Sequence, residues 1–211
     1  NGIRMIELHN ADCLDAMRLM DDDSFELAIV DPPYGIGAGS EKFVNGTRKK
    51  TPSYFRKNDW DIKPTKEYFQ ELQRVSKNQI IWGGNYFIDY LQSTRCMIFW
   101  DKTIHGNSYA DGELAWTSFN SNARYFRANI VQITIDGRIH PTQKPVALYT
   151  WLLEKYAKKG DRILDTHLGS GSIAIACHNL GYDLTGYELD KDYYQAACKR
   201  LENHQKQLRM F

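Results

Sequence analysis

The sequence lacks any apolar run approaching the roughly 18 residues of a membrane-spanning helix, and its first residues lack the apolar core of a secretory signal. We therefore expect no contact with a membrane. Cysteine is scarce, with four residues and no CxxC pair, which argues against a zinc ribbon or a disulfide framework. Free thiols in a reducing cytoplasm are the simpler expectation. The six histidines show no HxxxH spacing, so we predict no metal site.

An excess of charge of one sign is also absent. The 27 Lys and Arg residues face 26 Asp and Glu residues, a net charge of +1 that neither supports nor excludes a nucleic-acid partner. The segment 42–57, however, contains six basic residues and no acidic one. These are Lys42, Arg48, Lys49, Lys50, Arg56 and Lys57. Such a run is often only a solvated loop, but the aromatic residues among these basic ones favour contact with a nucleic acid.

Apolar runs that alternate with amphipathic stretches predict an α/β fold. The predicted strands cover residues 3–8, 25–30, 78–82, 96–100, 113–117, 129–135, 161–165 and 183–187. The predicted helices cover residues 65–76, 144–157, 172–180 and 191–207. This order predicts three layers around a mostly parallel sheet. Since no linker divides the chain, we expect one domain over residues 1–211.

A glycine-rich turn follows the predicted strand 161–165 and opens a helical pattern. Gly169 and Gly171 let the backbone approach a ligand closely, and the helix N-terminus offers unpaired N–H groups. Glu188 ends the next predicted strand, where a carboxylate can accept hydrogen bonds from the ribose hydroxyls of an adenosyl ligand. The pattern favours a nucleotide-like cofactor over a turn that merely joins strand to helix. It does not separate a nicotinamide dinucleotide from S-adenosylmethionine.

The tetrapeptide Asp31-Pro32-Pro33-Tyr34 follows the apolar strand 25–30, at the end of a strand where α/β proteins bind ligands. The two prolines make the turn rigid and leave its carbonyls as acceptors. Asp31 and the Pro32 carbonyl can both face one amino group, and Tyr34 supplies a flat face for an aromatic ring. A nucleobase that carries an exocyclic amine satisfies all three groups.

Together, the tetrapeptide and the later Asp165-x-x-x-Gly169-Ser170-Gly171 resemble the DNA amino-methyltransferases, which methylate the exocyclic amine of adenine or cytosine with S-adenosylmethionine. Because the tetrapeptide precedes the glycines, the chain resembles their circularly permuted β class, known from restriction–modification, cell-cycle control and phages. Residues 10–13, 140–145 and 186–190 also resemble segments of this family. The resemblance implies a Rossmann-like fold, S-adenosyl-L-methionine as cofactor and double-stranded DNA as partner.

The resemblance also implies roles for individual residues. Asp31, Pro32, Pro33 and Tyr34 would be catalytic, with Tyr34 stacked on a base flipped out of the duplex. The residues expected to bind the cofactor are Asp12, Lys144, Asp165, His167, Gly169, Ser170, Gly171 and Glu188. His167 stands where the family usually has Phe or Tyr, and we expect its ring to pack rather than to act as a general base.

Aspartate as the first residue of the tetrapeptide favours N6 of adenine as the methyl acceptor, because the cytosine-directed relatives more often have serine there. The alternatives are an N4-cytosine enzyme, a nicotinamide-dependent oxidoreductase and a non-catalytic subunit that only binds DNA. The oxidoreductase would leave the tetrapeptide unexplained. We expect DNA contacts from residues 35–59 and 101–140 rather than from a separate recognition domain. A homodimer would widen the DNA footprint of so small a chain, and a bacterial or phage origin fits the resemblance.

Overall fold

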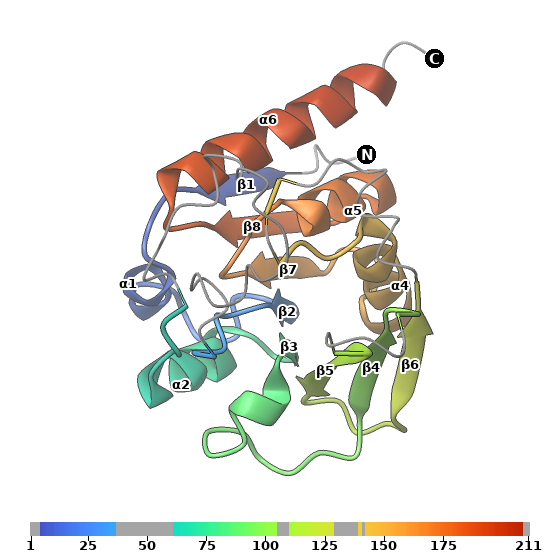
Figure 1. The fold of residues 1–211 in the computed structure, drawn as a ribbon. Coiled ribbons are helices and arrows are strands. Elements are labelled where there is room, and N and C mark those ends of the chain that lie inside the picture. Colours follow the sequence, from blue (N-terminus) through green and yellow to red (C-terminus); the bar gives the residue numbers. More distant parts are fainter. Residues whose placement is uncertain (1–4, 37–60, 105–109, 129–138, 141, 209–211) are drawn as a thin grey trace, which may run out of the picture.

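The computed structural model describes residues 5–36, 61–104, 110–128, 139–140 and 142–208 (Figure 1). Within these ranges an 8-stranded sheet has the strand order β1-β8-β7-β2-β3-β5-β4-β6. The strands are β1 (Ile6–His9), β2 (Leu27–Val30), β3 (Gln79–Trp82), β4 (Met97–Asp101), β5 (Gly112–Thr117), β6 (Arg124–Arg127), β7 (Arg162–Asp165) and β8 (Asp183–Tyr187).

The direction of the strands determines which loops share an edge of the sheet. β1, β8, β7, β2 and β3 pair in parallel, β5 runs antiparallel between β3 and β4, and β6 is parallel to β4. The carboxyl ends of all the strands except β5 therefore lie at one edge, together with the amino end of β5. This edge is called the carboxyl edge below. The mostly parallel sheet predicted from the sequence is confirmed.

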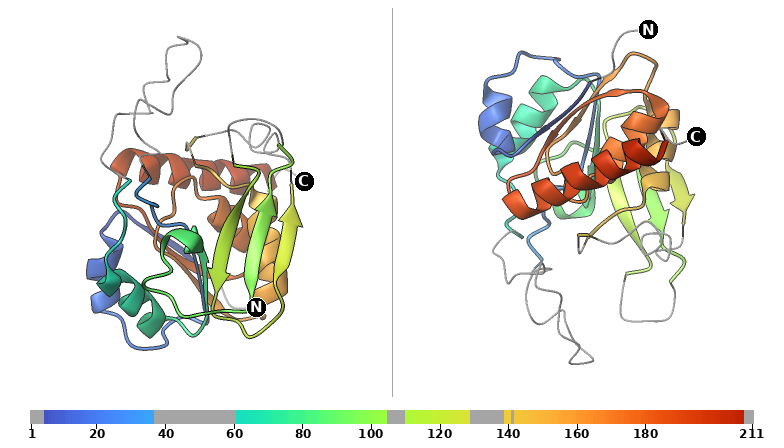
Figure 2. Two further views of the ribbon diagram at one scale, coloured as in Figure 1. Left: turned by 60° about the horizontal axis from the view of Figure 1, so that its bottom comes forward. Right: turned by 90° about the horizontal axis from the view of Figure 1, so that it is seen from above.

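Helices cover both faces of the sheet, as the two views of Figure 2 show. They are α1 (Cys13–Arg18), α2 (Lys66–Val75), α4 (Val146–Tyr156), α5 (Ser172–Leu180) and α6 (Lys191–Leu208), and a short 3₁₀ helix, η2 (Gly84–Tyr86), follows β3. α1 and α2 lie on one face, and α4, α5 and α6 lie on the other. The three-layer architecture is confirmed.

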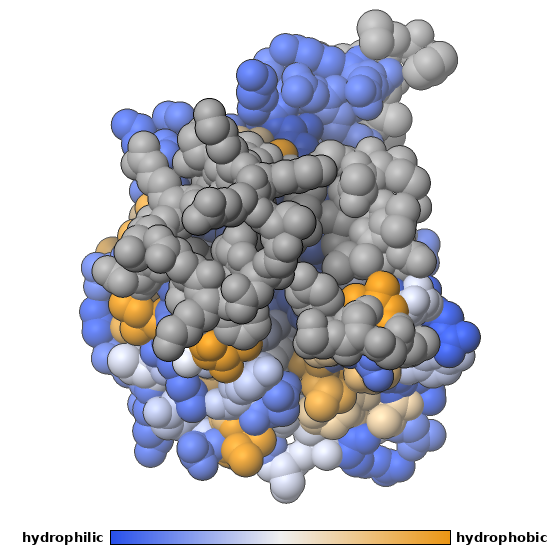
Figure 3. Space-filling view, in the orientation of Figure 1, coloured by the Kyte–Doolittle hydropathy of each residue, from blue (hydrophilic) through white to orange (hydrophobic). Residues whose placement is uncertain are grey.

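Successive side chains of β2 point to opposite faces of the sheet, and both faces are buried. Leu27 and Ile29 join the hydrophobic cluster under α4, α5 and α6, whereas Ala28 and Val30 join the cluster under α1 and α2. A strand with helices on both sides is apolar at every position, which is the pattern of Leu27–Val30. α6, at the edge of the molecule, buries a narrow stripe that includes Ala197 and presents a hydrophilic surface at the top of Figure 3.

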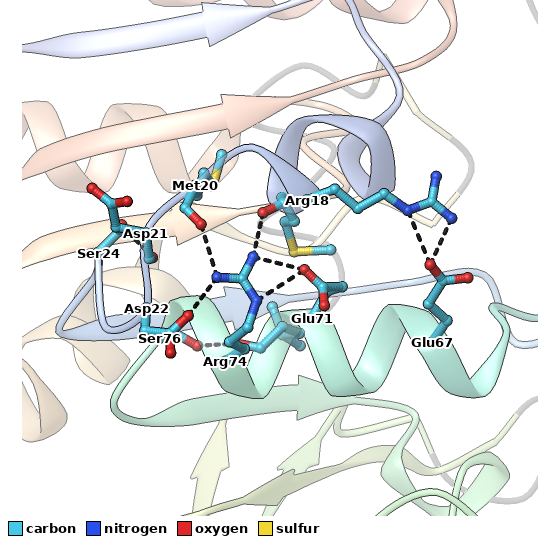
Figure 4. A network of polar contacts seen from close by, with 11 residues as sticks. Arg18, Met20, Asp21, Asp22, Ser24, Glu67, Glu71, Arg74 and Ser76 are labelled. Atoms are coloured by element: carbon cyan, nitrogen blue, oxygen red, sulfur yellow. Dashed lines mark hydrogen bonds and ion pairs between the residues drawn. The ribbon is translucent and has the colours of Figure 1, made fainter.

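The two helices α1 and α2 are joined by Arg74, at the end of α2 (Figure 4). Its guanidinium donates to the carbonyl oxygens of Met17 and Met20 at 2.7 and 2.8 Å, and pairs with Asp22 and Glu71. One side chain thereby satisfies the carbonyls at the end of α1 and fixes how α1 lies on α2.

The structure contains two elements that were not predicted, and one predicted strand cannot be compared. The predicted strand 129–135 lies outside the described residues, whereas residues 124–127 form the unpredicted edge strand β6. Its sequence, RYFR, is mostly exposed and lacks the apolar alternation on which strand prediction depends. α1 was also not predicted, because it has only 6 residues. In the described part of the chain, no helix is both long and apolar enough to span a membrane.

Candidate active site

The carboxyl edge brings together segments that are far apart in the sequence. β2 and β7 are direct neighbours, so the tetrapeptide after β2 lies beside the glycine-rich turn after β7. Glu188 follows β8 on the other side of that turn, and Gly83 follows β3 on the other side of the tetrapeptide. Open α/β sheets bind ligands at this kind of edge. The structure therefore joins the two motifs predicted to form one site.

Tyr34 is fixed against Asp31 and a second aromatic ring. Its hydroxyl donates to Oδ1 of Asp31 at 2.8 Å and lies 3.3 Å from Oε2 of Glu113. Its ring stacks on that of Tyr86, with centroids 4.9 Å apart and planes 20° apart. Gly83 makes this packing possible, because a Cβ at that position would lie 2.2 Å from Cε1 of Tyr34.

Asp31 belongs to a cluster of four charged side chains. Nζ of Lys144 lies 2.5 Å from Oδ2 of Asp31 and 2.9 Å from Oε2 of Glu113. The other oxygen of Glu113, Oε1, lies 2.6 Å from Nζ of Lys102. The Lys144 side chain is only 1% exposed. Burial of these groups is tolerable because the two carboxylates and two ammonium groups are paired.

The pairing shifts the pKa values of these groups. Burial alone would raise the pKa of Glu113, but Lys144 and Lys102 overcome it and lower that pKa to about 2. Burial likewise opposes the charge of Lys144, but its two carboxylate neighbours outweigh burial and raise its pKa. The pKa of Asp31 is raised, mainly by burial and also by Glu113, and Lys144 limits the rise. Glu113 is thus ionised, and Lys144 protonated, at neutral pH.

Neither Glu113 nor Lys102 was predicted from the sequence to belong to a charged cluster with Asp31. Glu113 begins a predicted strand, and a sequence does not show that this strand runs antiparallel and so starts at the carboxyl edge. Lys102 directly follows β4, which was the available signal. Lys144 was expected to contact the cofactor, and in the structure its ammonium contacts Asp31.

The glycine-rich turn has the backbone geometry expected of a ligand-binding turn. Gly169 and Gly171 have φ angles of +52° and +70°, in the left-handed region that favours glycine. A Cβ on Gly169 would meet no atom nearer than the His140 ring, at 3.8 Å. Oε2 of Glu188 accepts from the Gly169 N–H and its Oε1 from the Asp190 N–H, each at 2.9 Å. The turn and the end of β8 thus hold each other in place.

Asp165 is buried and His167 is half-buried, both just before this turn. Burial raises the pKa of Asp165 to about 8, although Oδ1 accepts from the His167 N–H at 3.0 Å. Burial also lowers the pKa of His167 to about 4, so its ring is neutral at pH 7. That ring packs edge-on to Tyr68, with centroids 5.4 Å apart, and its Nδ1 lies 2.9 Å from Oγ1 of Thr166. These contacts agree with a packing role for His167.

Ser170, Asp12 and the basic segment 42–57 were also predicted to contact a ligand. Ser170 is buried, and its carbonyl accepts from Arg200 at 2.9 Å. Asp12 lies at the same edge as the N-cap of α1, where Oδ1 accepts from the N–H groups of Leu14 and Asp15. The predicted DNA-contacting residues of segment 42–57 lie outside the described residues. No group of three or more His, Cys, Asp or Glu that could hold a metal is found among the residues described.

Comparison with known proteins identifies relatives over most of the chain. A family model described as DNA methylase matches residues 47–199. The type II methyltransferase M.HpaI of Haemophilus parainfluenzae is 23% identical over 238 residues, covering 92% of this chain and 73% of that protein. M2.DpnII of Streptococcus pneumoniae, also a type II methyltransferase, is 23% identical over 249 residues, covering 96% and 91%.

Solved structures share the fold. The M1.HpyAVI–SAM complex superposes with a TM-score of 0.62 at 22% identity, covering 93% of this chain and 100% of that one. The PvuII DNA methyltransferase, described as cytosine-N4-specific, superposes with a TM-score of 0.60 at 11% identity, covering 94% and 89%.

Proposed function

The chain belongs to the DNA methylase family, and we propose that it methylates the exocyclic N6 amine of an adenine flipped out of duplex DNA. S-adenosylmethionine is the methyl donor of this family. The observation that carries the proposal is the position of the Asp31 carboxylate and the Tyr34 ring beside the glycine-rich turn, on neighbouring strands. The acceptor of the methyl group and its donor would meet at that edge.

The residues proposed to hold the cofactor are Asp12, Asp165, His167, Gly169, Ser170, Gly171 and Glu188. Two observations support this fit. The space next to Gly169 is open to 3.8 Å where a side chain would stand, so a ligand can approach the backbone. The Glu188 oxygens each accept one backbone N–H, and a carboxylate oxygen can accept a second donor such as a ribose hydroxyl. When bound, S-adenosylmethionine supplies a methyl group activated by a neutral thioether leaving group.

The chain's own residues would orient and activate the amine. An exocyclic amine of a nucleobase is a weak nucleophile, because its lone pair is conjugated with the ring. Asp31 and the Pro32 carbonyl would accept its two N–H bonds and stabilise the positive charge that develops on nitrogen in the transition state. Tyr34, held by Tyr86 and by its bond to Asp31, would stack on the base and fix its orientation.

Adenine is proposed over cytosine because Asp31 is the first residue of the tetrapeptide. N4 of cytosine is the second candidate, because an enzyme described as cytosine-N4-specific shares the fold of this chain. The two amines present the same two N–H donors, so the geometry around Asp31 serves both.

The phosphate contacts are proposed to come from the basic residues of segment 42–57. Flipping a base costs a few kcal/mol, which such contacts would offset. Replacement of Lys49 and Lys50 by alanine should weaken DNA binding and reduce its dependence on salt concentration.

Product identification tests the proposal. The protein would be incubated with isotopically labelled S-adenosylmethionine and unmethylated duplex DNA, and the nucleosides analysed by mass spectrometry. Label in N6-methyladenine is the expected result, and label in N4-methylcytosine would select the second candidate. No label in DNA, while the protein still binds S-adenosylmethionine, would overturn the proposal.

A further inference from the structure

Both oxygens of Asp31 are already engaged by this chain. Oδ1 accepts from the Tyr34 hydroxyl at 2.8 Å, and Oδ2 lies 2.5 Å from the ammonium of Lys144. Under the proposed function, Asp31 must accept an N–H bond from the target amine. The amine of the base would therefore share these oxygens with the Tyr34 hydroxyl and the Lys144 ammonium.

The same ammonium has a second acceptor close at hand. Oε2 of Glu113 lies 2.9 Å from Nζ of Lys144, and Glu113 is itself anchored by Lys102 through its other oxygen. Lys144 cannot turn to solvent easily, because its side chain is 1% exposed and Nζ lies 5.2 Å from the Trp82 ring centroid. An ammonium displaced from Asp31 would thus stay in the site, on Glu113.

We propose that Lys144 is a positioning residue for Asp31: its ammonium, bridged between Asp31 and Glu113, orients the Asp31 carboxylate and favours its charged form. The role of Asp31 as the acceptor of the target amine rests on the proposed function. This assignment differs from the cofactor contact that the sequence resemblance implied for Lys144.

The charged and titratable groups around Asp31 determine what removal of Lys144 would do. Among the described residues, six titratable groups interact with the charge of Asp31, and one of them is a cation. They are Lys144 before α4, Glu113 on β5, Tyr34 after β2, Tyr68 on α2, Tyr149 on α4 and Asp165 at the end of β7. Without Lys144, burial and the charge of Glu113 would both favour the protonated form of Asp31.

Two variants should therefore shift the titration of Asp31 in opposite directions. Lys144→Met keeps the length of the side chain and removes the charge, so Asp31 should titrate at a pH at least one unit higher. Glu113→Gln removes the like charge and leaves Lys144 to Asp31 alone, so Asp31 should titrate at a lower pH. Lys144→Arg should stay near the wild type. The matched control is Lys158→Met, an exposed lysine just after α4, which should change nothing.

The measurement is the ¹³C chemical shift of the Asp31 carboxyl carbon against pH, with its signal assigned by its absence in Asp31→Asn. This readout does not need activity. If Lys144→Met fails to fold, Lys144→Gln, which also removes the charge, should show the same upward shift. Titration of Asp31 at the wild-type pH in the uncharged Lys144 variant that folds would overturn the proposal.

Activity distinguishes Lys144 as a partner of Asp31 from Lys144 as a cofactor ligand. In Lys144→Met, the acid limb of the pH–kcat profile should move to higher pH, while the Kd for S-adenosylmethionine stays within about three-fold. A Kd raised tenfold or more with an unmoved acid limb would overturn the proposal. If the wild type transfers no methyl group to DNA, the proposed function fails, and the titration of Asp31 still decides the role of Lys144.

Discussion

Ala28 of β2 lies opposite Leu164 of β7 in parallel register, although the two residues come from opposite ends of the chain. This pairing carries the tetrapeptide and the glycine-rich turn to the same edge of the sheet. Each motif alone is a local turn, and their chemistry becomes that of one site only through the contact between these two strands.

Replacement of Asp31 by alanine should abolish methyl transfer while leaving cofactor binding within a few-fold. In the proposed mechanism the carboxylate acts on the amine of the base, so its loss would remove transition-state stabilisation, and we expect kcat to fall by at least about 100-fold. Methylation assays and calorimetric titration with S-adenosylmethionine check both parts. Asp21→Ala, at an exposed position between α1 and β2, is the control. Wild-type activity in Asp31→Ala would contradict the mechanism.

Replacement of Gly169 by alanine should weaken cofactor binding by tenfold or more. The new Cβ would occupy the open space beside the turn. An alanine held at the φ angle of +52° that Gly169 adopts would also cost about 1 kcal/mol of stability. Gly160→Ala is the matched control, because Gly160 has a φ angle of +94° and no atom within 4 Å of the new Cβ. Both variants should lose some stability in urea denaturation, but only Gly169→Ala should lose affinity. Equal affinities would place the cofactor elsewhere.

Arg74→Met should lower the melting temperature by several degrees, because it removes the donors of the Met17 carbonyl in α1 and the Met20 carbonyl just after it, as well as two ion pairs. Arg18→Met is the comparison, since Arg18 joins the same two helices but contacts only the carboxylates of Asp15 and Glu67. Its loss should have little effect, as is usual for exposed ion pairs. Calorimetry measures both variants, and a larger effect for Arg18 would show that the carbonyl contacts of Arg74 are unimportant.

The stability of the protein should depend on pH through Asp165. Its pKa is about 8 in the folded protein against the ordinary value of 3.8, so the folded state binds a proton that the unfolded state releases. That contribution is complete below about pH 4 and is lost as the pH rises through 8.

In Asp165→Asn the carboxyl group is gone, so the variant should gain stability relative to the wild type between pH 5 and 8.5, by more than about 1 kcal/mol. Urea denaturation of both proteins across this range measures the difference. The exposed Asp21→Asn variant should follow the wild type. Parallel curves for Asp165→Asn and the wild type would show that Asp165 ionises normally in the folded protein.

The fold could be predicted from the sequence where the sheet is buried on both faces. The apolar run 25–30 and the helix 172–180 appear in the structure as β2 and α5 with similar bounds, because deep burial leaves a strong pattern. The exposed edge strand β6 and the short helix α1 leave no such pattern and were missed. The family and its cofactor, predicted from the motifs, are confirmed by the match to DNA methylases.

The sequence by itself determined which groups each motif offers: the carboxylate of Asp31, the carbonyl of Pro32, and the glycines at 169 and 171 that permit a left-handed turn. Only the tertiary structure decided which groups surround Asp31. Glu113 reaches it because β5 runs antiparallel and begins at the carboxyl edge, and Lys144 reaches it because the segment before α4 passes over that edge. Strand direction and strand order depend on packing between distant segments, and no local pattern of residues encodes them.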